Sequence, residues 1–236
     1  MSAKIVPFDE LLETDLIVDA IYLGGTANNA ADDPLNRLTR CGNMGGFRKV
    51  GRKEHFKYVV LYSSQSDRNW PDHLDPATGL FTYYGDNKTP GSQLHDTTRG
   101  GNRLLAHVFD RVHAFPSQRS EVPPFFIFTK ADPYGRRAVQ FRGLAAPGAN
   151  GVAPTDDLVA VWKSTQGYLP RPPSARTGSG GRLAPLGRRC SCYHLCAHFL
   201  LPPGAPLRPL ATRLGTLQCR TTWISFAGYG SRFLYT

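Results

Sequence analysis

The most informative part of this chain is the run Trp70-Pro-Asp-His-Leu-Asp-Pro-Ala-Thr-Gly-Leu-Phe-Thr-Tyr-Tyr-Gly-Asp-Asn87. The apolar run Tyr58–Tyr62 before it is typical of a central β-strand, and a loop as long as residues 63–79 is usually functional. Residues 80–84 predict a second, aromatic strand that ends at a Gly-Asp-Asn turn. This mixture suits a pocket for a planar, polar ring, because aromatic faces can stack on the ring and a carboxylate can accept from its amino group.

Alternation along the second strand divides its side chains between two faces. Phe81 and Tyr83 fall on one face, whereas Leu80, Thr82 and Tyr84 fall on the other. Both faces of one strand cannot line a single pocket.

The remaining pattern predicts an α+β protein. Further strands are expected at residues 16–23, 47–50, 125–128, 139–144 and 158–162, and helices at 8–13, from Asp33-Pro34 onward, and at 102–113. Because the strands mostly do not alternate with helices, the pattern argues against a doubly wound fold. We expect a twisted sheet that curls toward a barrel or crescent, with a few flanking helices.

Charge divides the chain near residue 163. Residues 1–163 hold all 18 acidic residues and 19 of the 28 Lys and Arg, a formal charge of +1. Residues 164–236 hold nine Arg and no Asp, Glu or Lys. We therefore expect a globular domain over 1–163 and an irregular Arg/Pro/Gly-rich tail over 164–236. Any nucleic-acid binding by the first part must use a local basic face.

Targeting signals are not evident in the sequence. The amino terminus has no apolar core of signal-peptide length, and no stretch approaches the roughly 18 apolar residues of a membrane span. Cys41 is the single cysteine of residues 1–163, which fits a reducing compartment. These features predict a cytoplasmic protein that has no membrane partner.

Four segments carry a resemblance to a known family. They are Gly42-Asn-Met-Gly-Gly-Phe-Arg48, Leu80–Gly91, Leu94–Asn102 and Leu158–Lys163. They resemble the SRA domain, and more closely its bacterial variant, the amino-terminal domain of modification-dependent restriction endonucleases of the MspJI/AspBHI type. The resemblance covers about residues 10–163.

The resemblance implies both a fold and a function. It implies an SRA-like, crescent-shaped β-barrel that recognises 5-methylcytosine or 5-hydroxymethylcytosine in double-stranded DNA by base flipping. In this family a separate carboxy-terminal nuclease domain, which uses Mg²⁺, then cuts at a distance. We find no Glu-x-Lys or Gln-x-Lys nuclease motif in this chain. We therefore expect the chain alone to be non-catalytic and to need no cofactor or metal.

Candidate residues for the flipped base come from the loop and the strand that follows it. Tyr83 matches the pocket tyrosine of the family and is expected to stack on the base; the structural alternative is a core aromatic. Asp72 is our candidate for the carboxylate that accepts from the amino group, with Asp67 and Asp75 as rivals that could instead form turns. Trp70 is expected to wall the pocket or to serve packing.

Candidate contacts to the DNA backbone flank this site. Arg48, Lys88 and Arg99 are candidates for phosphate contacts, although a solvated surface cation is the alternative for each. Residues 39–49 form a loop of the size needed to enter a groove and read neighbouring bases.

The composition of the tail is open to three interpretations. It could be an arginine-rich arm that binds phosphates without specificity. The five residues Cys190, Cys192, His194, Cys196 and His198 could bind zinc, but their every-second-residue spacing differs from the usual zinc pattern. The abrupt loss of three charged residue types favours the third reading, an out-of-frame product of a G+C-rich gene.

Two further functions stay open beside a truncated reader of modified cytosine. The chain could be the recognition subunit of an active endonuclease whose cutting domain is on another polypeptide. It could also be a defective remnant that neither folds well nor binds DNA. The sequence leaves the oligomeric state open.

Overall fold

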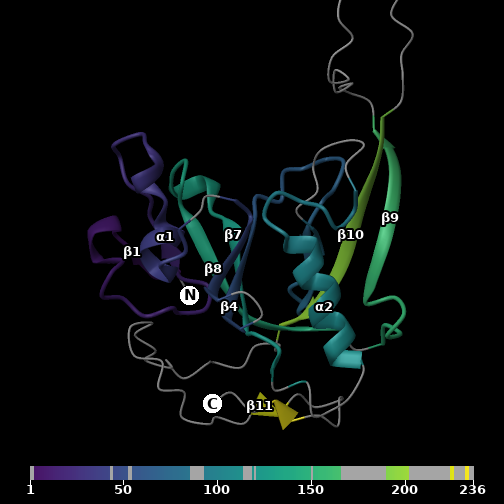
Figure 1. Cartoon of the computed structure of the whole chain (residues 1–236). Helices are drawn as coiled ribbons and strands as arrows, with labels where there is room; N and C mark the ends of the chain where they lie inside the picture. Colours follow the sequence, from purple (N-terminus) through teal and green to yellow (C-terminus); the bar gives the residue numbers. More distant parts are fainter. Residues whose placement is uncertain are drawn as a thin grey trace, which may run out of the picture.

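The computed structural model describes residues 3–42, 45–52, 55–85, 93–113, 119, 121–149, 151–165, 190–201, 224–225 and 232–233. In this part of the chain, ten strands form one mixed, open sheet, and a separate pair of short strands forms a second. Figure 1 shows helices α1 and α2 on either side of strands β4, β7 and β8. The predicted α+β class, a sheet with a few flanking helices, is confirmed.

The bounds of the elements are as follows. The strands are β1 (Ile5–Val6), β2 (Ile21–Tyr22), β3 (Phe47–Arg52), β4 (His55–Ser63), β5 (His73–Leu74), β6 (Leu80–Tyr84), β7 (Phe125–Lys130), β8 (Val139–Pro147), β9 (Leu158–Thr165), β10 (Cys190–Leu200), β11 (Ile224–Ser225) and β12 (Arg232–Phe233). The helices are α1 (Pro34–Thr39) and α2 (Gly101–His113), with 3₁₀ turns η1 (Phe8–Glu10), η2 (Ala30–Asp32) and η4 (Asp132–Tyr134).

The sheet is a crescent rather than a barrel. Its main path runs β3-β4-β7-β8-β10-β6-β5, with β2 beside β8, β1 beside β2, and β9 beside β10. Strands β3 and β5 therefore remain as edges, so the closure that the barrel alternative requires is not made. Strands β4 and β7 are parallel. The segment between them includes α2, as a parallel connection requires a long crossover.

The two faces of β4 belong to two hydrophobic cores. Val59 and Leu61 point to the core that α2 covers. Tyr58 and Val60 point to the opposite core, which α1 covers. A strand that is buried on both faces needs no polar side, and this explains the uninterrupted apolar run at its centre.

Helix α2 covers the first core with the face that its sequence predicts. Its apolar residues recur every three or four positions. The buried members of this face are Leu104, Leu105, Val108, Phe109 and Val112. They pack against residues of β3, β4, β6, β7, β8 and β10. The helix therefore holds the two ends of the crescent around one core.

Helix α1 begins as its Asp-Pro signal predicts. Asp33 is the N-cap residue, and its Oδ1 accepts a hydrogen bond from the Leu35 amide at 2.9 Å. Pro34 occupies the first turn, where a missing amide proton costs nothing. Leu35 and Leu38 are buried in the second core.

The sheet extends beyond residue 163 through β10, which lies between β6 and β8 at one end and beside β9 along its length. The side chains of Ala197 and Phe199 are fully buried, and Leu201 is 5% exposed. Their alternation is that of a strand with one face in the core. Residues 166–189 and most of 202–236 lie outside the described residues, so the out-of-frame origin of the tail stays a prediction.

A buried carboxylate ties β10 to the rest of the fold. The Asp157 side chain is fully buried, and its Oδ1 accepts from the Ala149 amide at 3.1 Å. Its Oδ2 lies 3.3 Å from Nε2 of His113, at the end of α2. Its backbone carbonyl accepts from the His198 amide at 2.9 Å. One residue thus contacts α2, the end of β8 and β10.

The charge of Asp157 predicts a pH dependence of stability. Burial raises the pKa of this carboxyl above its ordinary value of 3.8, although the His113 charge opposes the shift. A raised pKa in the folded state means that the folded chain binds the proton more tightly than the unfolded chain. Relative to Asp157→Asn, the unfolding free energy of the wild type should therefore rise as the pH falls from neutral toward 3.8. Urea unfolding at several pH values measures this difference; a difference that stays constant or falls with acidification contradicts it.

No helix in the described part of the chain is long and apolar enough to span a membrane.

Candidate nucleic-acid interface

The turn between β5 and β6 uses the carboxylate of Asp75. Its Oδ1 accepts from the Ala77 amide at 2.9 Å and its Oδ2 from the Thr78 hydroxyl at 2.6 Å. The hydrogen bond from Thr78 holds the pKa of Asp75 below its ordinary value. Gly79 closes the turn with φ of +73°, in the left-handed region that favours glycine. Asp75 therefore has the turn-forming role that was the alternative to base contact.

Asp67 has a similar local role in the loop after β4. Its Oδ1 accepts from the amides of Asn69 and Trp70, at 3.0 and 3.1 Å. Such a turn, closed by an Asp side chain, fixes the direction of the following residues. Asp67 thereby positions Trp70.

Asp72 differs from both rivals because it reaches across to another strand. Its Oδ1 accepts from the Tyr84 amide at 2.8 Å, which fastens the loop to the end of β6. The ring of Trp70, 6% exposed, lies 5.5 Å from that of Tyr84, with the two planes tilted by 56°. The structure therefore gathers one carboxylate and two aromatic rings at the end of β6: Trp70, Asp72 and Tyr84.

Tyr83 lies on the opposite face of β6, as strand alternation requires. It is 3% exposed and belongs to the first core, with its ring 6.0 Å from that of Phe81. Its hydroxyl lies beside Gly46, where an added Cβ would come within 3.7 Å of it. Tyr83 thus joins β6 to the start of β3, on the other side of the strand from Trp70 and Tyr84. Its stacking role stays a prediction.

Tyr84 is one of the aromatic residues that the sequence offers for stacking, but it is not among the predicted pocket residues. The alternation that placed it on the face opposite Tyr83 was already visible in the sequence. What the sequence did not show is that the Trp70 ring packs against the Tyr84 ring and that Asp72 accepts from the Tyr84 backbone amide.

The end of β6 is fixed against the start of α2. A Cβ at Gly85 would lie 2.0 Å from Oδ1 of Asn102, so the backbone can pass there only as glycine. Asn102 is fully buried, and its side-chain amide donates to the Leu94 carbonyl at 2.7 Å. The position of the Trp70–Asp72–Tyr84 group is therefore set by the core and not by the loop alone.

Arg99 lies at the surface beside the segment that precedes β3. Its guanidinium packs against Gly45, where an added Cβ would lie 3.1 Å from Cζ. The Arg99 carbonyl accepts from Nζ of Lys49 at 2.7 Å. The Arg99 guanidinium has no ion-pair partner among the described residues. This placement fits its predicted contact with phosphate, which stays a prediction.

Arg48, a predicted phosphate contact, is instead buried at 3% exposure. Its Nη2 forms an ion pair with Oδ2 of Asp33 at 2.7 Å. Its Nε donates to the Gly45 carbonyl at 2.8 Å, and its Nη1 donates to Oδ1 of Asn36 at 3.1 Å. All three nitrogen atoms are engaged inside the protein, so Arg48 holds the segment before β3 in place. A pairing of residues 15 positions apart has no signal in the sequence.

Two predictions fall on parts that the structure does not describe. Lys88 lies outside the described residues, as do two positions of the predicted groove loop, 43 and 44. The zinc alternative for the tail rests on Cys190, Cys192, His194 and Cys196, whose side chains are also outside the described set. Among the residues that are described, no group of three or more His, Cys, Asp or Glu side chains could hold a metal ion.

Comparison with known proteins gives consistent matches. A family model described as restriction endonuclease AspBHI N-terminal matches residues 16–171. The fold is similar to that of the DNA recognition domain of the cytosine modification-dependent restriction endonuclease LpnPI, with 42% identity and a TM-score of 0.72 over 87% of this chain and 82% of that chain. It is also similar to the DNA modification-dependent restriction endonuclease AspBHI, with 37% identity and a TM-score of 0.68 over 84% of each chain. No curated protein matches the chain significantly.

Proposed function

Because the chain belongs to the family of AspBHI amino-terminal domains, and is thus a DNA recognition domain of the modification-dependent restriction endonucleases, we propose that it binds 5-methylcytosine or 5-hydroxymethylcytosine in double-stranded DNA by flipping the modified base. The LpnPI domain, to which this chain is 42% identical, is the DNA recognition domain of a cytosine modification-dependent restriction endonuclease. We further propose that the chain acts on DNA in the cytoplasm.

The arrangement of Asp72 carries this proposal. A carboxylate is an acceptor only, so it pairs with the exocyclic amino group of cytosine and repels the carbonyl that thymine has at that position. The hydrogen bond from the Tyr84 amide fixes the direction of the Asp72 carboxylate. The Trp70 and Tyr84 rings pack together beside this hydrogen bond, 5.5 Å apart, and brace the loop that carries Asp72.

The energies of flipping are compatible with such a site. Extrusion of one base costs a few kcal/mol of lost stacking and pairing. Stacking on one aromatic ring stabilises the flipped base by about 1–3 kcal/mol, and a hydrogen bond to a charged acceptor contributes about 1.5–3 kcal/mol. A buried methyl group contributes only about 0.8 kcal/mol. Selectivity for the modified base therefore needs a tight wall around position 5 in addition to the methyl contact itself.

Two further roles complete the proposal. Tyr83 would stack on the base from the side of Gly46, which requires the base to enter between β6 and the start of β3. Arg99 and Lys88 would contact phosphates beside the flipped nucleotide. Arg48 is assigned to support the Gly45 segment through its hydrogen bond to that carbonyl.

We assign DNA cleavage to a nuclease domain outside these residues, on this chain or another. The family model that matches describes the amino-terminal part of a restriction endonuclease. Mg²⁺ would belong to that nuclease domain.

Asp72→Ala tests the proposed site. We expect this change to weaken binding to a duplex with one 5-methylcytosine by about 10- to 100-fold, since it removes one charged hydrogen bond to the base. Binding to the same duplex with unmodified cytosine should change by less than about threefold, because phosphate contacts dominate there. Fluorescence anisotropy with the two duplexes at one salt concentration measures both affinities.

Asp72→Asn is the matched control for this experiment. The amide oxygen can still accept from the Tyr84 amide, so the loop should keep its place, but the amide nitrogen cannot accept from cytosine. Asp72→Asn should therefore lose the preference for the duplex with 5-methylcytosine, as Asp72→Ala does. Equal losses on both duplexes for either variant would remove Asp72 from the site.

A further inference from the structure

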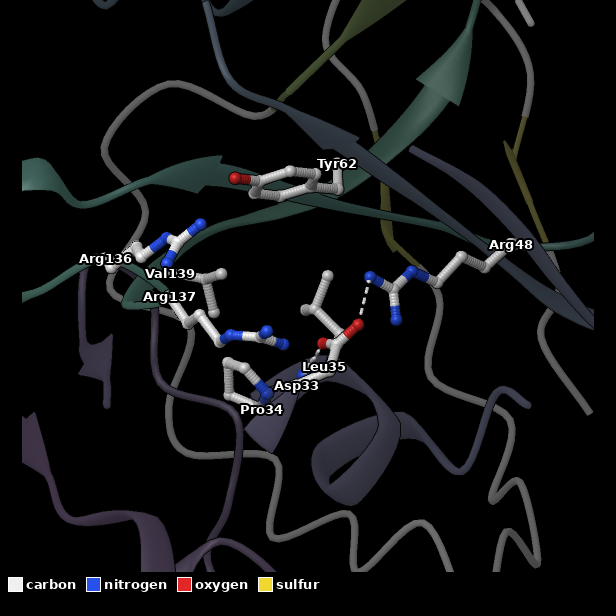
Figure 2. Close-up of a pocket in the computed structure, with 8 residues that line it drawn as sticks. All are labelled: Asp33, Pro34, Leu35, Arg48, Tyr62, Arg136, Arg137 and Val139. Carbon is white, nitrogen blue, oxygen red and sulfur yellow. Dashed lines mark hydrogen bonds and ion pairs between the residues drawn. The ribbon is translucent and has the colours of Figure 1, made fainter. Parts of the chain in front are cut away.

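A cavity lined by both charged and apolar residues lies on the α1 side of the sheet, away from the group at the end of β6. It has a volume of about 130 Å³. Figure 2 shows it between α1, Tyr62 near the end of β4, and the connection from β7 to β8. Its lining residues are Asp33, Pro34, Leu35, Arg48, Tyr62, Arg136, Arg137 and Val139.

The cavity carries three guanidinium groups and a single carboxylate. That carboxylate, Asp33, is already engaged twice: Oδ2 pairs with Arg48 at 2.7 Å, and Oδ1 caps α1 through the Leu35 amide. Asp33 and Arg48 therefore neutralise each other. The positive charges of Arg136 and Arg137 are left without compensation in the lining.

Arg136 and Arg137 have no hydrogen-bond or ion-pair partner among the described residues. Figure 2 shows both side chains turned into the space between Tyr62 and the start of α1. The Arg137 Cβ packs closely against Gly24, where an added Cβ would lie only 2.4 Å from it. The hydrogen bond from the Ala131 amide to the Ala138 carbonyl, at 2.9 Å, closes the base of the connection.

Tyr62 adds a hydroxyl donor to the same cavity. Burial raises the pKa of this phenol above its ordinary value of 10.0, so the hydroxyl keeps its proton at neutral pH. No hydrogen bond to the hydroxyl is present among the described residues. The nearby Lys130 and Asp132 form an ion pair with each other and leave the balance of charge in the cavity unchanged.

We infer that this cavity binds one phosphate-class oxyanion, held by the guanidinium groups of Arg136 and Arg137 and by the Tyr62 hydroxyl. Guanidinium forks match the oxygens of phosphate in geometry and in charge. A water molecule takes up about 30 Å³ of the liquid, so the cavity has room for roughly four, enough for a tetrahedral oxyanion. Two neighbouring cations that have no counter-ion in the described part of the chain would be stabilised by such a ligand.

The contacts around the cavity favour a phosphate of the DNA backbone, and this assignment rests on the proposed function. The Tyr62 amide donates to the Gly46 carbonyl at 2.7 Å, and Arg48 donates to the Gly45 carbonyl at 2.8 Å. The same two glycines contact Tyr83 and Arg99. The cavity is thus tied to the segment that the proposed base site also uses. Free inorganic phosphate is the other source with the same chemistry.

Titration of the whole chain with inorganic phosphate, followed by NMR or calorimetry, tests the cavity without DNA. The wild type should bind phosphate saturably, and Arg137→Gln should weaken that binding by about tenfold or more. Arg142→Gln is the matched control, since it removes one positive charge from β8 at a residue that pairs with Asp19 at 2.8 Å. Tyr62→Phe keeps the ring and should weaken phosphate binding to a smaller extent. Circular dichroism of each variant confirms folding.

A salt series with unmodified duplex identifies the source of the phosphate. If the cavity holds a DNA phosphate, Arg137→Gln should reduce the slope of log K against log salt by about 0.9, and Arg142→Gln should leave it unchanged. A loss of phosphate binding with an unchanged slope supports the cavity with free phosphate and overturns the DNA assignment. Equal behaviour of the two variants in both assays overturns the inference. The proposed function is tested separately, by the ratio of the wild-type affinities for modified and unmodified duplex. Neither the phosphate titration nor the salt series uses a modified duplex, so their outcomes do not depend on that ratio.

Discussion

Arg48→Ala should lower the free energy of unfolding by about 3–5 kcal/mol, the usual cost of leaving one member of a buried ion pair without its partner. Arg48 is 3% exposed and Asp33 is 6% exposed, so water cannot replace the lost guanidinium. The change also removes the donors to the Gly45 carbonyl and to Asn36. Urea unfolding of the chain with linear extrapolation measures the loss.

Arg142→Ala is the control for this prediction. Its partner Asp19 has a side chain that is 60% exposed, and surface pairs contribute only about 0–1 kcal/mol. The two variants lose the same charge and the same side chain. A small stability loss in Arg48→Ala, together with a large loss of DNA affinity, would contradict the buried role and restore Arg48 as a phosphate contact.

Phe199→Ala should also lower the free energy of unfolding by about 3–5 kcal/mol, because it opens a cavity in the first core. The ring of Phe199 is fully buried. Its centroid lies 4.9 Å from that of Phe125, 5.7 Å from that of Phe109 and 6.4 Å from that of Phe81. It thus joins β10 to α2, β6 and β7. The same urea measurement applies.

Leu12→Ala provides the comparison, since Leu12 is 53% exposed and surface changes usually stay within about 0.5 kcal/mol. If Phe199→Ala changed stability as little as Leu12→Ala, β10 would not belong to the folding unit. The boundary expected near residue 163 would then be the real end of the domain.

The parts of the fold that were predictable are those with strong local patterns. The apolar run of β4, the amphipathic face of α2 and the Asp-Pro start of α1 each follow from a few neighbouring residues. Strands β1 and β5 have two residues each, which is too short for a periodic signal. Strand β10 was not predicted because the Arg-, Pro- and Gly-rich composition of residues 164–236 is typical of irregular chain, and the alternation at Ala197, Phe199 and Leu201 is short.

In the candidate site, too, local contacts were predictable and contacts between distant residues were not. Asp75 and Asp67 form turns with residues two or three positions away, which is local chemistry that the sequence can indicate. The choice of Asp72 depends on its reach to Tyr84, 12 residues away. The burial of Arg48, the choice of the Tyr83 face of β6 as the core face and the cavity that Arg137 and Tyr62 both line depend on tertiary packing, which local patterns do not encode.

The most direct test of the account is the structure of the chain bound to a short duplex with a single central 5-methylcytosine. We predict that the modified base is rotated out of the helix, with its amino group within hydrogen-bond distance of the Asp72 carboxylate. A complex in which every base remains paired, with Asp72 away from the DNA, would contradict it.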